Sequence, residues 1–196
     1  MTIASPTYLA TEMQNRVLFF SIFVVFLASS FAPAEPVSGR IYAFKMVDVD
    51  GGTLSTTDGH VTVLVIITRR DADKARIVGD RIPARCLGNP VSRMVTVIRF
   101  APTRNSAARY ILTGLVRRKL DAEAKRLKSR YVAKKLTADP RADVHAVADF
   151  DGQIASRFGL PAGSTQPRVL ILARNGELLR GWVGVPTAEE LNAAIP

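Results

Sequence analysis

The stretch from Thr165 to Gly184 constrains the fold more than any other part of this chain of 196 residues. It reads Thr-Gln-Pro-Arg-Val-Leu-Ile-Leu-Ala-Arg-Asn-Gly-Glu-Leu-Leu-Arg-Gly-Trp-Val-Gly. Two extended runs flank Arg174-Asn175-Gly176, whose residues tolerate a positive φ, and this pattern predicts a β-hairpin. Proline cannot donate to a strand ladder, so Pro167 must lie at the start of its strand, and Gln166-Pro167 is a reasonable place for a cis bond.

The segments before the hairpin come in a recognisable order. Asp149-Phe150-Asp151-Gly152 predicts a turn into a helix over 153–158, and Phe158-Gly159-Leu160 ends that helix before Gln166-Pro167. In this order and spacing, residues 144–195 resemble the C-terminal half of a thioredoxin-fold protein, of the exported TlpA type or of a peroxiredoxin relative. The resemblance implies an α/β three-layer sandwich with a central mixed sheet.

Apolar runs rich in β-branched residues predict the strands of that sheet. Val61 to Thr68 is near-continuous, as expected for a central strand covered on both faces, and Val91 to Phe100 and Val144 to Ala148 follow. Residues 39–60 predict two short strands joined by a glycine turn, which resembles the N-terminal hairpin of the same proteins. Thr187 and Glu190 form a capping box that opens the last helix. We expect one thioredoxin-like domain over residues 35–196.

The loop after the central strand bears on activity. In thioredoxins this loop opens a helix with Cys-x-x-Cys, and in peroxiredoxins it carries Thr-x-x-Cys, because a helix N-terminus lowers the pKa of the attacking thiol. Thr68 matches the peroxiredoxin threonine, but Asp71 stands where the cysteine would be and cannot form a mixed disulfide. We expect Asp71 to cap the helix that runs to about Ile82. This degenerate active-site loop comprises Thr68, Arg69, Arg70, Asp71 and Asp73.

Cys86 is the only cysteine, so the chain has no internal disulfide. It follows Asp71 by about fifteen residues and lies beyond Pro83, which ends the preceding helix, so it is far from the helix N-terminus. A lone thiol is most often buried and inert, and burial is the expectation here. Arg81 and Arg85 are near in sequence and would lower its pKa, so single-cysteine chemistry remains the enzymatic alternative.

The two histidines do not predict a metal site. His60 and His145 lie in or beside predicted strands, without a cysteine, histidine or carboxylate at metal-ligand spacing, and we interpret both as structural. The aspartates between Asp139 and Asp151 are scattered rather than paired, and they lack the further ligands of a calcium loop. We therefore expect neither a metal nor a cofactor.

The formal charge of +10 at pH 7 is concentrated in one segment. Residues 102–142 carry twelve Lys or Arg against three Asp or Glu, an excess of nine. Within this segment, residues 105–136 predict one long helix or two in succession, with one apolar face. That face consists of Leu112, Val116, Leu120, Ala124, Leu127 and Tyr131. The favoured interpretation is an enlarged helix whose apolar stripe covers the sheet while its basic faces keep the surface soluble.

The alternative interpretation gives the basic helix a partner. The basic residues assigned to such an anionic-surface contact are Arg117, Arg118, Lys119, Lys125, Arg126, Lys128, Arg130, Lys134 and Lys135. For an exported protein the anions at hand are phospholipid headgroups and cell-envelope polymers, and each basic residue near such a surface contributes about 1 kcal/mol. Nucleic acid ranks last, because an export leader argues against it and no base-stacking aromatic cluster accompanies the charge.

Residues 1–34 are interpreted as a secretory leader. Val17 to Ala32 is uncharged and follows Arg16, and Ala32-Pro33-Ala34 has the small-x-small form of a signal-peptidase site. The apolar run is slightly short against the roughly 20 residues of a membrane span, so an uncleaved single-pass anchor is the minority interpretation. A start at Met13 would place a basic residue directly before the run. The prediction is a cut after Ala34 and a periplasmic or secreted protein.

These observations favour a redox-inactive thioredoxin-like protein that acts as a binding or interaction module. Its groove, where Thr68 to Asp73 meets Gln166-Pro167, would hold an extended protein or peptide partner through backbone hydrogen bonds. In active relatives the residue before the proline pairs with the bound chain, so the resemblance gives this role to Gln166. Two alternatives stay open: a single-cysteine thiol peroxidase or oxidoreductase using Cys86, and membrane binding through the basic helix.

Overall fold

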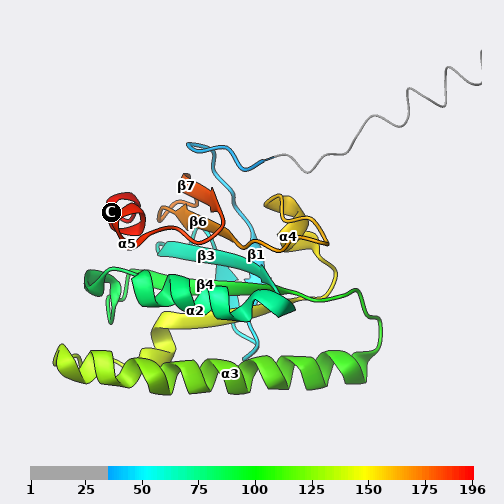
Figure 1. Ribbon diagram of the computed structural model, residues 1–196, viewed down its shortest axis with the longest axis horizontal. Helices are drawn as coiled ribbons and strands as arrows, with labels where there is room; N and C mark the ends of the chain where they lie inside the picture. The colour runs from blue at the N-terminus through cyan, green and yellow to red at the C-terminus, as the bar shows by residue number, and fades with distance from the viewer. Residues whose placement is uncertain (1–34) are drawn as a thin grey trace, which may run out of the picture. The chain divides into compact units, whose positions relative to one another are not determined.

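The structure, a computed structural model, describes residues 35–196, which belong to one compact unit with its own hydrophobic core (Figure 1). The expected leader 1–34, its cut after Ala34 and the alternative start at Met13 lie outside the described residues. Within residues 35–196, no helix combines the length and the apolar composition needed to cross a membrane.

A mixed five-stranded sheet forms the centre of the unit. Its strands are β3 (Val61–Thr68), β4 (Ser92–Arg99), β5 (Val144–Asp149), β6 (Arg168–Leu172) and β7 (Leu178–Val183), in the spatial order β5-β4-β3-β6-β7. The first three strands run parallel, whereas β6 is antiparallel to both β3 and β7. The run predicted as the central strand therefore lies at the centre.

β3 is central because both of its faces are apolar. Val63 and Val65 belong to the core on one face of the sheet, whereas Leu64 and Ile66 belong to the core on the other, and all are buried. Period-two alternation places successive side chains on opposite faces, so a continuous apolar run requires cover on both sides.

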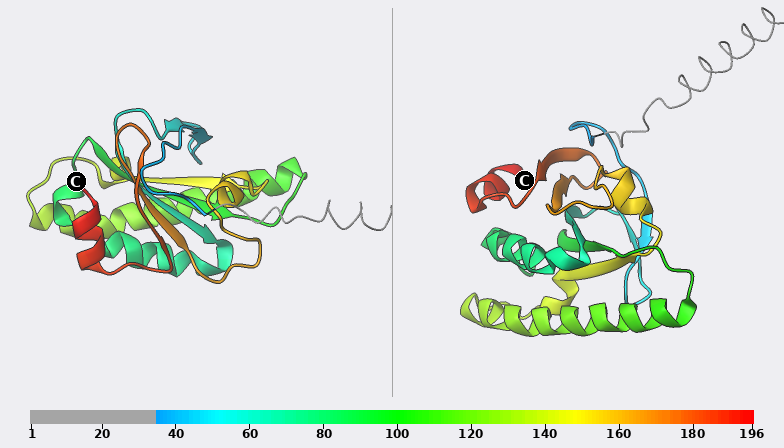
Figure 2. Two further views of the ribbon diagram at one scale, coloured as in Figure 1. Left: turned by 90° about the horizontal axis from the view of Figure 1, so that it is seen from above. Right: turned by 45° about the vertical axis from the view of Figure 1, so that its right-hand side comes forward.

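Helices and a hairpin supply that cover. One face packs against α2 (Ala72–Arg81), α3 (Ser106–Ala133) and α5 (Ala188–Ala194), and Figures 1 and 2 show the three in the order α5, α2, α3. The other face packs against α4 (Gln153–Arg157) and the antiparallel hairpin of β1 (Lys45–Val47) and β2 (Thr53–Ser55). Short 3-10 turns are η1 (Arg69–Asp71), η2 (Ala84–Cys86) and η3 (Pro140–Asp143). The expected three-layer sandwich, with its N-terminal hairpin and basic helical insertion, is confirmed.

The insertion is a single helix, α3, that begins at an Asn105 cap whose side chain accepts a hydrogen bond from the Ala108 amide (3.1 Å). The predicted apolar stripe packs beside β5, and its buried members are Val116, Leu120, Ala124, Leu127 and Tyr131. Leu112, at the N-terminal end of the stripe, is only partly buried. α3 thus extends the helical layer over the β5 edge of the sheet.

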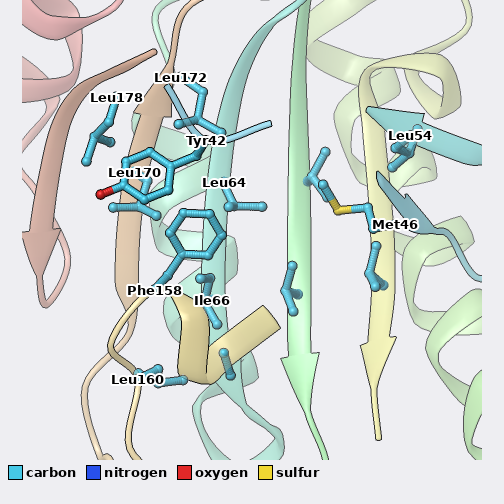
Figure 3. Packing of buried hydrophobic residues seen from close by; sticks show 14 residues of the cluster. Tyr42, Met46, Leu54, Leu64, Ile66, Phe158, Leu160, Leu170, Leu172 and Leu178 are labelled. Atoms are coloured by element: carbon cyan, nitrogen blue, oxygen red, sulfur yellow. The ribbon is translucent and has the colours of Figure 1, made fainter. Parts of the chain in front are cut away.

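On the opposite face, Phe158 fills the space between the sheet and the N-terminal segment (Figure 3). Its side chain is fully buried, and its ring centroid lies 5.4 Å from that of Tyr42 and 5.2 Å from that of Phe44. Leu64 and Leu170 approach the same ring from β3 and β6. The aromatic residue that ends α4 therefore joins this helix, the sheet and the N-terminal segment.

The C-terminal hairpin forms as the sequence predicts, with Gly176 at φ 81° in its turn. The expected cis bond at Gln166-Pro167 is wrong, because no peptide bond within residues 35–196 is cis. Pro167 nevertheless precedes β6, and its carbonyl accepts a hydrogen bond from the Gly184 amide (2.8 Å). The Gln166-Pro167 bond is therefore trans, the form that X-Pro bonds favour by about 0.5–1 kcal/mol.

Residues just after position 34 cover part of the free edge of β7. The Gly39 amide donates to the Leu178 carbonyl (2.8 Å), the Leu178 amide donates to the Arg40 carbonyl (2.9 Å), and Ile41 forms a bridge with Glu177. An unpaired strand edge invites association with other chains, so this segment protects the beginning of β7.

Candidate functional site

Two loops that are far apart in sequence meet at one end of the sheet. Because β6 is antiparallel to β3, the start of β6 lies beside the end of β3, and Ile66 pairs with Arg168. The loop from Thr68 to Asp73 therefore neighbours the residues that precede β6. Lys74, in the first turn of α2, donates a hydrogen bond across this junction to the carbonyl of Thr165.

Asp71 anchors this end of α2, but not in the expected way. The prediction that its side chain caps the helix is wrong, since that side chain accepts no backbone hydrogen bond at the helix start. It accepts instead from the Thr68 hydroxyl (2.5 Å) and from the Lys74 ammonium (2.8 Å). The Lys74 contact joins two charged groups, and hydrogen bonds from first Lys74 and then Thr68 lower the pKa of Asp71 below its usual value.

The other members of the degenerate loop point to solvent. The side chains of Arg69, Arg70 and Asp73 are exposed, and Asp73 lines a cavity between α2 and α3 rather than the junction with Thr165. Lys74 is the residue at this junction that the sequence analysis missed. The helical spacing of Asp71 and Lys74, three residues apart, is the signal that predicts their contact.

Gln166 lies on the surface beside the junction. A single side chain serves both of its backbone groups: the Ser164 hydroxyl donates to the Gln166 carbonyl (2.9 Å) and accepts from the Gln166 amide (3.2 Å). The Gln166 side chain is exposed, whereas Pro167 is buried. Gln166 thus has a donor and an acceptor that are bonded only to a local hydroxyl.

A pocket of about 380 Å³ opens beside these backbone groups. Residues 159–168 and Val183 of β7 form most of its wall. Arg168 is the charged residue among those that line it, and its guanidinium also donates to the Gly159 carbonyl (3.2 Å). This volume is near the lower end of the roughly 300–1,000 Å³ found for small-ligand pockets.

Cys86 lies at the other end of the sheet. It precedes β4, which runs parallel to β3, and it packs with Val61 at the start of β3 and with Ile195. The side chain is buried, as predicted, and burial raises the pKa of the thiol, with Arg85 opposing only in part. Cys86 also lines a largely apolar cavity of about 340 Å³ between α2, α3 and the sheet. These surroundings disfavour the thiolate that nucleophilic chemistry requires.

Each histidine faces an aspartate that sequence spacing did not reveal as a partner. His60 Nδ1 lies 2.9 Å from the Asp58 carboxylate, which also forms an ion pair with the Arg93 guanidinium (2.8 Å). His145 Nδ1 lies 3.5 Å from the Asp48 carboxylate. Burial lowers the pKa of His145, and the Asp48 carboxylate opposes it. Within residues 35–196, no group of three or more His, Cys, Asp or Glu side chains could hold a metal ion.

The nine basic residues assigned to a surface contact divide into two groups. Arg117 binds Asp50 (2.9 Å), Arg126 binds Asp80 (2.5 Å) and Arg130 donates to the Gly79 carbonyl (3.4 Å), so these three fasten α3 to the rest of the unit. The remaining six are exposed and form no ion pair within the described residues: Arg118, Lys119, Lys125, Lys128, Lys134 and Lys135.

Comparison with known proteins rests on structure. No family model matches the sequence, and no curated protein matches it. A candidate protein disulfide isomerase from Bacteroides thetaiotaomicron is 12% identical, with a TM-score of 0.50 over 82% of this chain and 91% of that one. The fold is thioredoxin-like. As in the prediction, this thioredoxin-like chain lacks the catalytic cysteine motif, since its only cysteine is Cys86.

Two other similar structures have TM-scores below 0.5. The exposed lipoprotein thioredoxin Etrx1 of Streptococcus pneumoniae is 14% identical, with a TM-score of 0.46 over 78% of this chain and 96% of that one. The peroxidoxin BcpB of Mycobacterium tuberculosis is 10% identical, with a TM-score of 0.48 over 82% and 93%. At these scores they add nothing to the fold assignment.

The environment of Cys86 in this thioredoxin-like protein predicts an unreactive thiol. We expect 5,5'-dithiobis(2-nitrobenzoic acid) to label native Cys86 roughly a hundredfold more slowly than Cys86 in the unfolded chain, because a buried thiol with a raised pKa reacts only after opening. We also expect no peroxide consumption and no disulfide reduction, with Cys86→Ser as the control. Activity that disappears in Cys86→Ser would make Cys86 a catalytic residue.

Proposed function

We propose that this chain is an exported thioredoxin-like protein that has no thiol chemistry and binds an extended peptide at Gln166. The observation that carries the proposal is the Ser164 hydroxyl, which both donates to and accepts from the backbone of Gln166. A bound strand offers the same pair, one amide and one carbonyl, to a single residue of its partner. The Ser164 hydroxyl therefore bonds the same amide and carbonyl of Gln166 that the backbone of a bound peptide would bond.

The loop chemistry supports a role without thiol exchange. At the end of β3, the position at which related proteins carry a cysteine holds Asp71, which is ionised and bonded to Thr68 and Lys74. Lys74 continues from Asp71 to the Thr165 carbonyl and ties α2 to the loop before Gln166. A carboxylate that accepts two hydrogen bonds in this way has a structural role, because it neither attacks a disulfide nor takes up a proton near neutral pH.

The neighbouring pocket supports recognition of a side chain. Once the backbone of a peptide pairs with Gln166, an adjacent side chain would enter the pocket of about 380 Å³. The pocket wall supplies one guanidinium, that of Arg168, whose side chain is largely buried and lies 3.6 Å from the exposed carboxylate of Glu35. Because a carboxylate pairs well with a guanidinium, we expect peptides with Asp or Glu at that position to bind best.

The export part of the proposal rests on the sequence. Residues 17–34 carry an apolar run and a small-x-small site, the pattern of a secretory leader. The formal charge of +10 also suits a protein that works among anionic envelope surfaces.

A panned peptide library tests the proposed site directly. We expect a random-peptide phage library to yield peptides that bind the full chain and bind Gln166→Ala equally, because alanine keeps the backbone donor. Gln166→Pro removes that donor and should abolish binding, whereas Ser164→Ala frees both backbone groups and should raise affinity about fivefold, the value of one hydrogen bond of about 1 kcal/mol.

Two results would contradict the proposal. One is a library that yields no specific peptide, and the other is a set of peptides that bind Gln166→Pro as tightly as the natural chain. Cooperative thermal unfolding of each variant shows whether lost binding has a local cause. Ser164→Ala provides a second test in case Gln166→Pro fails to fold.

A further inference from the structure

The face of α3 that points away from the sheet is not uniformly basic, contrary to the prediction from its sequence. Large apolar side chains are exposed there, with Ile111 60% exposed and Leu115 49% exposed, and Tyr110 beside them is 82% exposed. Helical spacing places these positions roughly opposite the buried stripe of Val116 and Leu120. The first half of α3 is therefore apolar on two sides.

The exposed positions form one continuous stripe along the helix. We call it the outer face, and it consists of Ala107, Ile111, Leu115, Arg118, Ala122 and Lys125. Successive members are three or four residues apart, so they lie in a row on the solvent side. All six side chains are exposed, and Figure 1 shows α3 at the boundary of the unit with no described element beyond it.

The charges around the outer face decide what can cover it. α3 carries eight Lys or Arg against two Asp or Glu, and its first half, residues 106–120, carries no Asp or Glu at all. Within the described residues, Arg118, Lys119 and Lys125 have no ion-pair partner. A second copy of this chain would bring two strongly positive helices together, which electrostatic repulsion opposes.

We propose that the outer face of α3 docks on an anionic phospholipid surface. The proposal does not depend on peptide binding at Gln166, which lies outside α3. Ile111 and Leu115 enter the boundary between headgroups and acyl chains, and Tyr110 lies at headgroup level, where its ring and hydroxyl suit both environments. Arg118 and Lys125 contact lipid phosphates from the same face. An interfacial helix of this kind lies in the plane of the membrane and does not cross it.

Vesicle binding by the segment 35–196 tests the proposal, since these residues contain the core clusters described above and exclude the apolar leader. We expect binding to phosphatidylcholine vesicles with about 30 mol% phosphatidylglycerol, little binding without the anionic lipid, and weaker binding as salt rises from about 0.1 to 0.5 M. A Tyr110→Trp variant should show a blue-shifted emission on binding, because its indole leaves water.

Two sets of variants separate insertion from charge attraction. Ile111→Ser with Leu115→Ser leaves the charge unchanged and should weaken binding about tenfold without changing the salt dependence. Arg118→Gln with Lys125→Gln should weaken binding and also reduce the salt dependence. The matched control is Val47→Ser, which alters a similarly exposed apolar residue (61% exposed) on β1 and should have no effect.

Three outcomes would overturn the proposal. If Ile111→Ser with Leu115→Ser binds vesicles like the unaltered segment, the apolar stripe does not insert. If a single-stranded oligonucleotide binds as tightly as the vesicles and depends on Arg118 and Lys125 alone, the surface serves nucleic acid. If sedimentation shows a dimer that the serine variants dissociate, the outer face belongs to a second copy of the chain.

Discussion

Replacing Asp58 with alanine is expected to lower the free energy of unfolding by about 3 kcal/mol, the lower end of the range for breaking a buried ion pair. Asp58 accepts two hydrogen bonds from Arg93, at 2.8 and 3.0 Å, and the Arg93 side chain is almost fully buried. Arg93 also donates to the Thr62 hydroxyl (3.1 Å), but a neutral hydroxyl would not compensate the guanidinium charge once Asp58 is replaced. Chemical denaturation of the segment 35–196 measures the loss.

The matched control is Asp50→Ala, which removes an exposed carboxylate paired with Arg117 and Arg141. We expect it to cost less than about 1 kcal/mol, because exposed ion pairs contribute little. An equal cost for Asp50→Ala and Asp58→Ala would show that the burial of Arg93 has no energetic consequence.

The same ion pair makes stability depend on pH. Burial opposes ionisation of Asp58, but hydrogen bonds from Arg93 and His60 overcome it and lower its pKa from 3.8 to about 2. The unfolded chain therefore binds a proton first as the pH falls, so this contribution is complete above about pH 4 and is lost between about pH 4 and pH 2. Asp58→Ala should flatten the stability profile over that range, which denaturation at several pH values would measure.

Replacing Phe158 with alanine is expected to destabilise the unit by about 3–5 kcal/mol, the cost of a large cavity in a packed core. Phe158 has no exposed surface and contacts rings from the N-terminal segment as well as side chains of β3 and β6 (Figure 3). A loss of this size is a large part of the total stability of an ordinary domain, about 5–15 kcal/mol. Thermal and chemical unfolding would both record it.

Tyr110→Ala is the control for Phe158→Ala, since it removes an aromatic ring that is 82% exposed. We expect its effect on stability to stay within about 0.5 kcal/mol. A small effect of Phe158→Ala would mean that the N-terminal segment does not depend on α4 for its position.

Local pattern was enough to predict the sheet. The β-branched run over 61–68 and the Asn175-Gly176 turn each determine an element through the residues within it, and the structure has both where they were expected. The burial of Cys86 also follows from a local preference, because a lone cysteine behaves as a small apolar side chain. The lack of a cysteine motif needed only the sequence itself.

The details of the candidate site depend on contacts that sequence spacing does not show. Asp71 is a good capping residue, yet Lys74 and Thr68 bind its carboxylate instead, and the Lys74 contact with Thr165 joins residues 91 positions apart. His145 meets Asp48 only because β5 lies near the N-terminal hairpin. The hydroxyl of Ser164 on Gln166 is local, but loop geometry rather than residue type determines it.

The apolar outer face of α3 was missed for a different reason. One stripe of apolar residues explained the helical pattern, so Ile111 and Leu115 on the other side were assigned to a basic surface. Their spacing of four residues is the signal that predicts a second apolar stripe in the same helix. The excess of Lys and Arg in α3 therefore does not indicate that its solvent-facing side is partly apolar.

The short N-terminal segment beside β7 is also a tether. The Val37 amide donates to the Tyr42 hydroxyl (2.8 Å), so only Glu35 and Pro36 lie between this fixed point and residue 34, a reach of about 10 Å. Figures 1 and 2 show this segment and α3 on opposite sides of the sheet. The described chain therefore begins beside β7 and not beside the outer face of α3. A label or fusion attached just before Glu35 would therefore leave the outer face of α3 uncovered.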